Sequence, residues 1–200
     1  GFPLGAALAA FLISLILNED GSNFQYTFLL ALLFLPYGWI IHKYLPESKA
    51  WLEAQQRKTD DQPQPSTLVL FRKEWRRKSL LLFTGQFLYA FAYGSTFFLP
   101  FYLQLDRGYL EGEAIKMVGQ AYAIGSLGYI AAAIVGEFFL IRRNTIIAWA
   151  LLGGCAFIAL IWWAETSNQI IIAFSLMSFF FYGAYAVMAT FIAENFPAEL

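Results

Sequence analysis

Six apolar stretches follow one another along this sequence, separated by breaks that hold nearly all of its charged residues. A helix of about 20 apolar residues crosses the ~30 Å core of a bilayer, and one charge at its centre costs roughly 2.5–3.5 kcal/mol. The stretches are Phe2–Leu17, Phe24–Ile41, Ser79–Leu105, Ile115–Leu140, Thr145–Ala164 and Gln169–Ala193. We therefore predict an all-α fold, a polytopic membrane bundle with six transmembrane helices.

The composition agrees with lipid as the solvent. Hydrophobic residues make up 59% of the chain and charged residues 14%, where soluble domains carry about 25% charged residues. A net charge of −1 gives no cationic excess for nucleic acid, and a single cysteine and a single histidine support neither a disulfide framework nor a metal site. The chain begins with Gly1 rather than Met, so we expect it to be a fragment of a longer protein.

The positions of the cations predict how the helices cross the bilayer. Nine of the 13 Lys and Arg residues lie between Lys43 and Lys78, and two more are Arg142 and Arg143. Cytoplasmic loops of membrane proteins carry an excess of Lys and Arg. If the two cation-rich breaks lie in the cytoplasm, the other breaks fall on the opposite side. We therefore expect one topology in the cell membrane, with both ends of the fragment in the cytoplasm.

The long break between the second and third stretches divides the chain into two bundles. We expect a short surface helix over Pro46–Lys58, a polar linker over Thr59–Ser66, and an interfacial pattern over Leu68–Lys78, where apolar and basic residues alternate. The predicted division is 1–45 for the last two spans of an N-terminal bundle, 46–78 for the loop, and 79–200 for the first four spans of a C-terminal bundle.

Two of the predicted spans carry polar side chains at helical spacing, and these are the candidate solute-binding residues. They are Gln86, Tyr89, Tyr93 and Thr96 in the third span, and Ser178, Tyr182 and Tyr185 in the sixth. Separations of three and four place the members of each set on one helical face. The alternative is that these groups satisfy hydrogen bonds between helices, each worth about 0.6 kcal/mol.

Small residues and tryptophans predict how the helices pack and where they end. Steps such as Gly128/Ala132 and Ala150/Gly154 allow close approach of helix backbones. Four tryptophans are expected at the membrane interface, where amphipathic rings are enriched. They are Trp39, Trp149, Trp162 and Trp163.

Two short motifs resemble those of a known family. Residues 45–52 read Leu-Pro-Glu-Ser-Lys-Ala-Trp-Leu, which resembles the Pro-Glu-Ser-Pro-Arg-Trp-Leu motif after the sixth span of the sugar-porter and metabolite/proton-symporter branches of the major facilitator superfamily. Residues 194–200 read Glu-Asn-Phe-Pro-Ala-Glu-Leu, similar to the Glu-x-Phe-Pro motif after the tenth span. Four predicted spans separate the motifs, as in the family, so the resemblance implies spans five to ten of twelve.

The sequence also departs from the family. The Gln-Gln-x-x-Gly-x-Asn signature of sugar porters is absent from the seventh span, which argues against a hexose substrate. Before Arg142 and Arg143 the family usually has Gly-x-x-x-Asp-Arg-x-Gly, and here only the paired arginines and a nearby acid, Glu137, are found.

The resemblance implies a set of residues that tie the two halves together at the cytoplasmic face. They are Glu47, Glu137, Arg142, Arg143 and Glu194. We expect Glu194 to pair with Arg142 or Arg143, forming a latch that exists in one conformation. The alternative is that the arginines are topology signals and the acids are simply solvated.

The predicted function is secondary active transport of a small organic solute by alternating access, coupled to protons. No Asp, Glu, Lys, Arg or His lies in the middle of a span, so the proton-carrying group is expected elsewhere in the protein. No cofactor, metal or obligate protein partner is expected besides membrane lipids, and no catalytic constellation suggests an enzyme. The alternative function is a non-transporting sensor or scaffold of the same fold.

Overall fold

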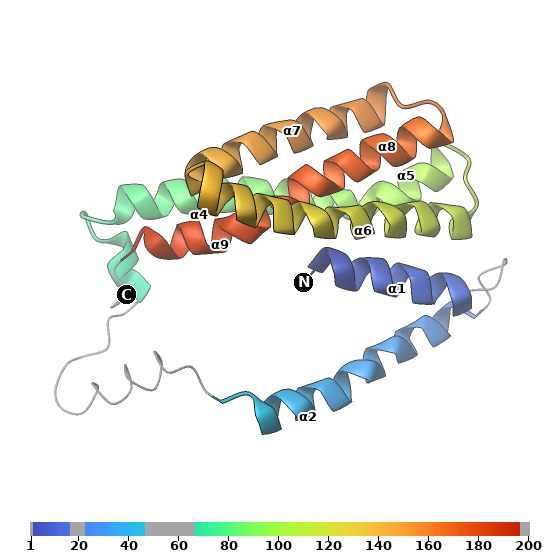
Figure 1. Ribbon diagram of the computed structural model, residues 1–200, viewed down its shortest axis with the longest axis horizontal. Helices are drawn as coiled ribbons and strands as arrows, with labels where there is room; N and C mark the ends of the chain where they lie inside the picture. Colours follow the sequence, from blue (N-terminus) through green and yellow to red (C-terminus); the bar gives the residue numbers. More distant parts are fainter. Residues whose placement is uncertain (1, 17–22, 47–66, 197–200) are drawn as a thin grey trace.

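The computed structural model describes residues 2–16, 23–46 and 67–196, and these described residues form helices and no strand (Figure 1). The segment 47–66 lies outside them, and with it the expected surface helix and linker. In chain order the helices are α1 (Phe2–Ile16), η1 (Phe24–Leu33), α2 (Phe34–Tyr44), η2 (Thr67–Phe71), α4 (Arg76–Ser95), η3 (Thr96–Phe98), α5 (Leu99–Leu105), α6 (Glu111–Ile134), η4 (Val135–Phe139), α7 (Arg142–Trp162), α8 (Ser167–Met177), η5 (Ser178–Tyr182) and α9 (Tyr185–Glu194). Of these, η1, η2 and η3 are 3₁₀ helices, whereas η4 and η5 are π-helical.

Among the described residues, four helical runs are long and apolar enough to cross a membrane, which agrees with the predicted membrane bundle. They are Gln25–Tyr44, Glu111–Phe139, Arg142–Trp162 and Ser167–Glu194. Two other spans were expected. The first of them falls on α1, whose apolar part Pro3–Ile16 is shorter than any of these four runs. The other falls on α4, η3 and α5, which follow one another without a gap.

Helix α6 is the centre of the packing. It contacts α1 along one side and α8, η5 and α9 along another, while α7 covers α8 and η5 (Figure 1). Phe174, Met177 and Tyr182 from the last run are almost completely buried there. Apolar side chains on the outer faces, such as Leu151 and Phe138, stay exposed, as expected of helices that meet lipid.

Close approach between α6 and η5 requires glycine at two positions. A Cβ added to Gly128 would overlap the carbonyl oxygen of Phe179, and one added to Gly183 would lie 2.6 Å from the carbonyl oxygen of Gly128. On the far side of η5, a Cβ on Gly153 of α7 would come within 2.8 Å of the Phe181 nitrogen. We expected close packing at Ala150 and Gly154, but the close contact is made by Gly153 instead. No described atom lies within 4 Å of a Cβ built on Gly154.

Trp149 corrects a second expectation. Its ring is buried, in edge contact with Phe180 at a centroid distance of 5.6 Å. Trp39, Trp162 and Trp163 are exposed. Trp149 lies two turns into α7, where the neighbouring π-helical segment brings an aromatic partner against it, so it packs inside the bundle rather than at its edge.

Between residues 76 and 194, two of the runs change their helix type midway. The first passes from α4 through the 3₁₀ segment η3 into α5, with Pro100 near the start of α5. The last passes from α8 through the π-helical segment η5 to α9. Such interruptions leave the regular backbone hydrogen-bond ladder, and π-helical turns occur often at functional sites.

Candidate functional site

The two interrupted helices meet at their interruptions. The hydroxyl of Tyr182, the last residue of η5, donates to Oγ1 of Thr96, the first residue of η3, over 2.8 Å. Both side chains are buried, Tyr182 completely. The hydroxyl of Tyr122 from α6 lies 3.5 Å from that of Tyr182, so three helical runs converge on one polar point.

Aromatic side chains from the same three runs form what we call the tyrosine cluster, Tyr89, Tyr93, Tyr122, Tyr182 and Tyr185. The ring of Tyr93 makes edge contacts with Tyr182 and Tyr185, at centroid distances of 5.5 and 5.6 Å. Edge contacts of this kind add about 0.5–1.5 kcal/mol to the burial of each ring.

Tyr89 fixes the helix α4 against η5. Its ring stacks on Phe181 with centroids 4.6 Å apart, and its hydroxyl donates to the Phe181 carbonyl oxygen. That carbonyl lies within the π-helical segment, where the backbone leaves the α-helical pattern. The tyrosine therefore provides a polar partner at the interruption as well as packing area.

Three polar atoms near the cluster are buried and have no hydrogen-bond partner among the described residues: Oε1 of Gln86 and the hydroxyls of Ser175 and Ser178. Leaving a buried polar group unpaired costs about 1–3 kcal/mol. Gln86 lies on the same face of α4 as Tyr89 and Tyr93 and is half-buried, whereas Ser178 is fully buried. Gln86 is thus the least buried of these three residues.

The structure brings the two predicted polar stripes together. Tyr89, Tyr93 and Thr96 on one side contact Tyr182 and Tyr185 on the other. Tyr122 and Phe181 were missed as members of this site. Tyr122 carried a usable signal, since it lies with Ser126 and Tyr129 at helical spacing in α6.

The hydrogen bond between Tyr182 and Thr96 makes a testable contribution to stability. In a double-mutant cycle of Tyr182→Phe and Thr96→Val, we expect a coupling energy of about 0.6 kcal/mol, typical of hydrogen bonds between membrane helices. The measurement is the free energy of unfolding of the full-length protein in mixed micelles. Pairing Tyr182→Phe with Thr84→Val, at an exposed position on α4, is the control and should give no coupling. Equal coupling in both cycles would contradict a direct bond.

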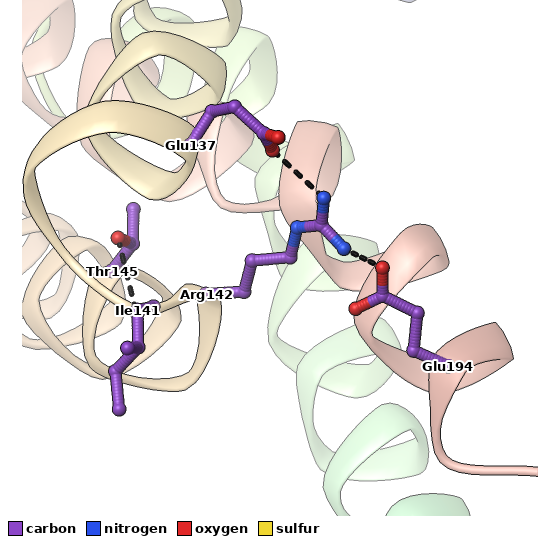
Figure 2. A network of polar contacts seen from close by, with 5 residues as sticks. All are labelled: Glu137, Ile141, Arg142, Thr145 and Glu194. Atoms are coloured by element: carbon purple, nitrogen blue, oxygen red, sulfur yellow. Dashed lines mark hydrogen bonds and ion pairs between the residues drawn. The ribbon is translucent and has the colours of Figure 1, made fainter.

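A second site lies at the turn between η4 and α7 (Figure 2). Nη2 of Arg142 lies 2.7 Å from Oε2 of Glu137, and Nη1 forms an ion pair with Glu194 at the end of α9. The backbone is extended at Leu140 and Ile141, which reverses the chain and places Arg142 back over η4. One guanidinium thus joins three helical segments, since its planar fork can bind two carboxylates at once.

The remaining residues expected in this network are placed differently. Arg143 is exposed and forms no ion pair with any described residue, although it lines the same open cavity of about 710 Å³ as Arg142, Glu194 and Phe191. Glu47 lies outside the described residues. We call the three joined residues, Glu137, Arg142 and Glu194, the Arg142 network. All three lie within 79–200, so the network joins helices inside that predicted unit rather than the two predicted halves.

A larger cavity of about 1030 Å³ lies between α1 and the first half of α6. Phe11 and Leu15 line one wall, and Glu113, Lys116 and Gln120 line the other. No residue predicted to bind solute lines this cavity. It lies near the opposite end of α6 from the Arg142 network, so the two cavities lie toward different ends of this helix.

Apolar helices long enough to span a bilayer, with a polar cluster buried between interrupted helices, define a polytopic helical membrane protein. The chain belongs to the Major Facilitator Superfamily, whose family model matches residues 1–200. This confirms the resemblance seen in the sequence motifs and places the chain with transport proteins rather than enzymes.

A cis,cis-muconate transport protein of Acinetobacter baylyi is 23% identical to the chain over 205 residues. The aligned region covers 100% of this chain and 49% of that protein, so the chain spans about half the length of this curated relative. No solved structure matches the chain.

Proposed function

We propose that the protein containing this chain is a secondary active transporter that moves a small organic solute by alternating access, coupled to protons. The observation that carries the proposal is the convergence of two interrupted helices on the tyrosine cluster. Solute sites of transporters lie near the middle of the membrane and are typically formed by discontinuous helices. Both interrupted helices here belong to the proposed bundle 79–200, so they would supply that bundle's side of the site. Family membership and the related transport protein support transport itself, whereas the coupling to protons is part of the proposal alone.

The proposed arrangement in the membrane follows from charge. With the cations of residues 67–78 and Arg142–Arg143 in the cytoplasm of the cell, the Arg142 network lies at the inner face. The first unit, 1–45, then belongs to one six-helix bundle and 79–200 to the other, joined by the loop 46–78. The larger cavity between α1 and α6 then opens toward the outside.

The less buried residues of the two predicted polar stripes are the proposed solute contacts. Gln86, Tyr93 and Tyr185 are half-buried and are therefore the least covered residues of the two stripes, although Oε1 of Gln86 is itself buried in this conformation. Tyr89, Thr96, Ser178 and Tyr182 are buried beneath them. We assign the first three to direct contact and the other four to holding the site in shape, with access only after the helices move.

Uptake of solute by the full-length protein in proteoliposomes tests the proposal. The panel contains small organic acids, amino acids and sugars, including cis,cis-muconate, each with and without a pH gradient. Saturable uptake that a pH gradient accelerates supports proton-coupled transport. Binding of a solute without any flux would instead favour the sensor or scaffold, and no binding or flux across the panel would overturn the proposal.

Gln86→Ala tests the proposed solute contacts. We expect it to weaken solute affinity about tenfold, because a hydrogen bond worth roughly 1–1.5 kcal/mol to the bound solute is lost. Tyr93→Phe should act in the same direction. Affinity is measured by equilibrium binding to purified protein, and Thr84→Ala, at an exposed position half a turn before Gln86, is the matched control. Unchanged affinity in both site variants would return these residues to a packing role.

A further inference from the structure

The stretch immediately before α4, residues 68–78, concentrates positive charge. It reads Leu-Val-Leu-Phe-Arg-Lys-Glu-Trp-Arg-Arg-Lys, with five cations and one acid. Arg72, Lys73, Arg76 and Arg77 are exposed, and none of them forms an ion pair with another described residue. We call these four residues the basic face.

The bundle holds this stretch in a defined position. The hydroxyl of Ser79 donates to the Leu70 carbonyl oxygen over 2.7 Å, and Nζ of Lys78 donates to the Asn195 carbonyl oxygen over 3.0 Å. The ring of Trp75 lies 6.0 Å from that of Phe196. In Figure 1 the stretch accordingly lies beside the end of α9. The basic face is therefore part of the folded protein rather than a free tail.

Helical geometry turns the basic face away from these contacts. The Arg76 nitrogen donates to the Arg72 carbonyl oxygen over 2.8 Å, which extends the helical turn back to Arg72. At about 100° per residue, the four cations then fall within an arc of about 140°, whereas Trp75 and Lys78 fall outside it. One side of the turn contacts Asn195 and Phe196 at the end of α9, and the other presents four cations that form no ion pair with a described residue.

The basic face lies at the start of α4, on which the third expected span falls, and this position decides which kind of anion the face can bind. Beyond Lys78 the chain continues directly into Leu80 and Leu81, both exposed apolar residues of α4, and Phe71 is 56% exposed just before the first cation. Cations flanked by exposed apolar side chains match a ligand with a phosphate and acyl chains. A soluble anion would use the charges and leave the apolar side chains in water.

We propose that the basic face binds the headgroups of anionic phospholipids, with Phe71, Leu80 and Leu81 against the acyl chains. Arginine suits this role because its guanidinium binds phosphate oxygens in pairs. Each cation near an anionic membrane surface contributes about fivefold to binding, so four together produce a large preference over a zwitterionic lipid. This site is separate from the solute site, and its occupancy is measured without transport.

The test uses the full-length protein in neutral detergent micelles and fluorescently labelled phosphatidylglycerol, whose binding is followed by anisotropy. We expect unlabelled phosphatidylglycerol to displace the probe at least tenfold more effectively than phosphatidylcholine. The variant R72Q/K73Q/R76Q/R77Q should bind the probe at least tenfold more weakly. K116Q removes an exposed cation at the other end of the bundle and should bind as the unmodified protein does.

Two further measurements separate charge from folding and lipid from free phosphate. The variant R72K/R76K/R77K keeps the charge and should retain most of the binding, even where the glutamine variant folds poorly. Equal displacement by the two lipids would overturn the proposal, as would unchanged binding by the glutamine variant or loss of binding in the lysine variant. Displacement by millimolar inorganic phosphate as effective as that by the lipid would show a site for a free anion and would also overturn it.

Discussion

Arg142→Gln is expected to lower solute uptake about tenfold in the full-length protein, with expression and helix content unchanged. Among the described residues, Arg142 alone forms ion pairs with both Glu137 and Glu194, so its loss removes the two ion pairs that connect η4, α7 and α9 and leaves two carboxylates near each other. Each pair is partly exposed and contributes at most about 1 kcal/mol, and two such pairs shift a conformational equilibrium by up to about thirtyfold. The initial rate of uptake into proteoliposomes measures the effect.

A reporter cysteine shows whether the shift is conformational. Leu82 lies one turn before Gln86 on the same face of α4, toward the proposed cytoplasmic end. In an otherwise cysteine-free protein carrying Leu82→Cys, both Arg142→Gln and Glu194→Gln should raise the rate of thiol labelling from that side about tenfold. Cys155 must be replaced first because it is exposed.

The neighbouring arginine provides the comparison. Arg143→Gln removes the same charge one residue away, from a side chain without an ion pair to the described residues, so it should change uptake and labelling by no more than about twofold. Similar losses from both arginines would contradict the Arg142 network as a latch. They would indicate instead that the paired arginines act through the overall charge of this face.

The difference between Arg142 and Arg143 shows what the sequence could predict about this site. Charge placement indicated which residues gather at one end of the bundle, because ionic groups avoid the hydrocarbon core. It gave no basis for choosing between adjacent arginines, which point about 100° apart on a helix. The choice depends on the extended backbone at Leu140 and Ile141, and the sequence has no distinct signal for that turn.

The tyrosine cluster shows a similar division. Spacings of three and four along each helix predicted one polar face on α4 and one on the last run, and the structure places these faces against each other. The π-helical segment η5 was not predictable from spacing, because a helical pattern assumes a constant rotation per residue. Tyr122 was not among the predicted solute-binding residues, although its hydroxyl lies 3.5 Å from that of Tyr182.

Gly128→Ala is expected to destabilise the protein more than alanine at any other glycine of α6. The added Cβ would overlap the carbonyl oxygen and Cα of Phe179, which belong to the backbone and cannot move aside by changing a rotamer. Overpacking of this kind costs about 1–3 kcal/mol, which corresponds to a fall in melting temperature of about 5 °C. Because Phe179 lies within η5, the displacement should also separate Tyr182 from Thr96 and weaken solute binding.

Gly154→Ala is the matched control, since it makes the same substitution inside a membrane helix at a position with open space around the missing Cβ. Alanine is favoured over glycine in a helix by up to about 1 kcal/mol, so this variant should be as stable as the unmodified protein or slightly more stable. The measurement is thermal unfolding of the full-length protein in detergent, together with solute affinity. If the two variants melted at the same temperature, α6 and η5 would have room to part. The contact at Gly128 would then not be what holds the interrupted helix, and with it Tyr182, in place.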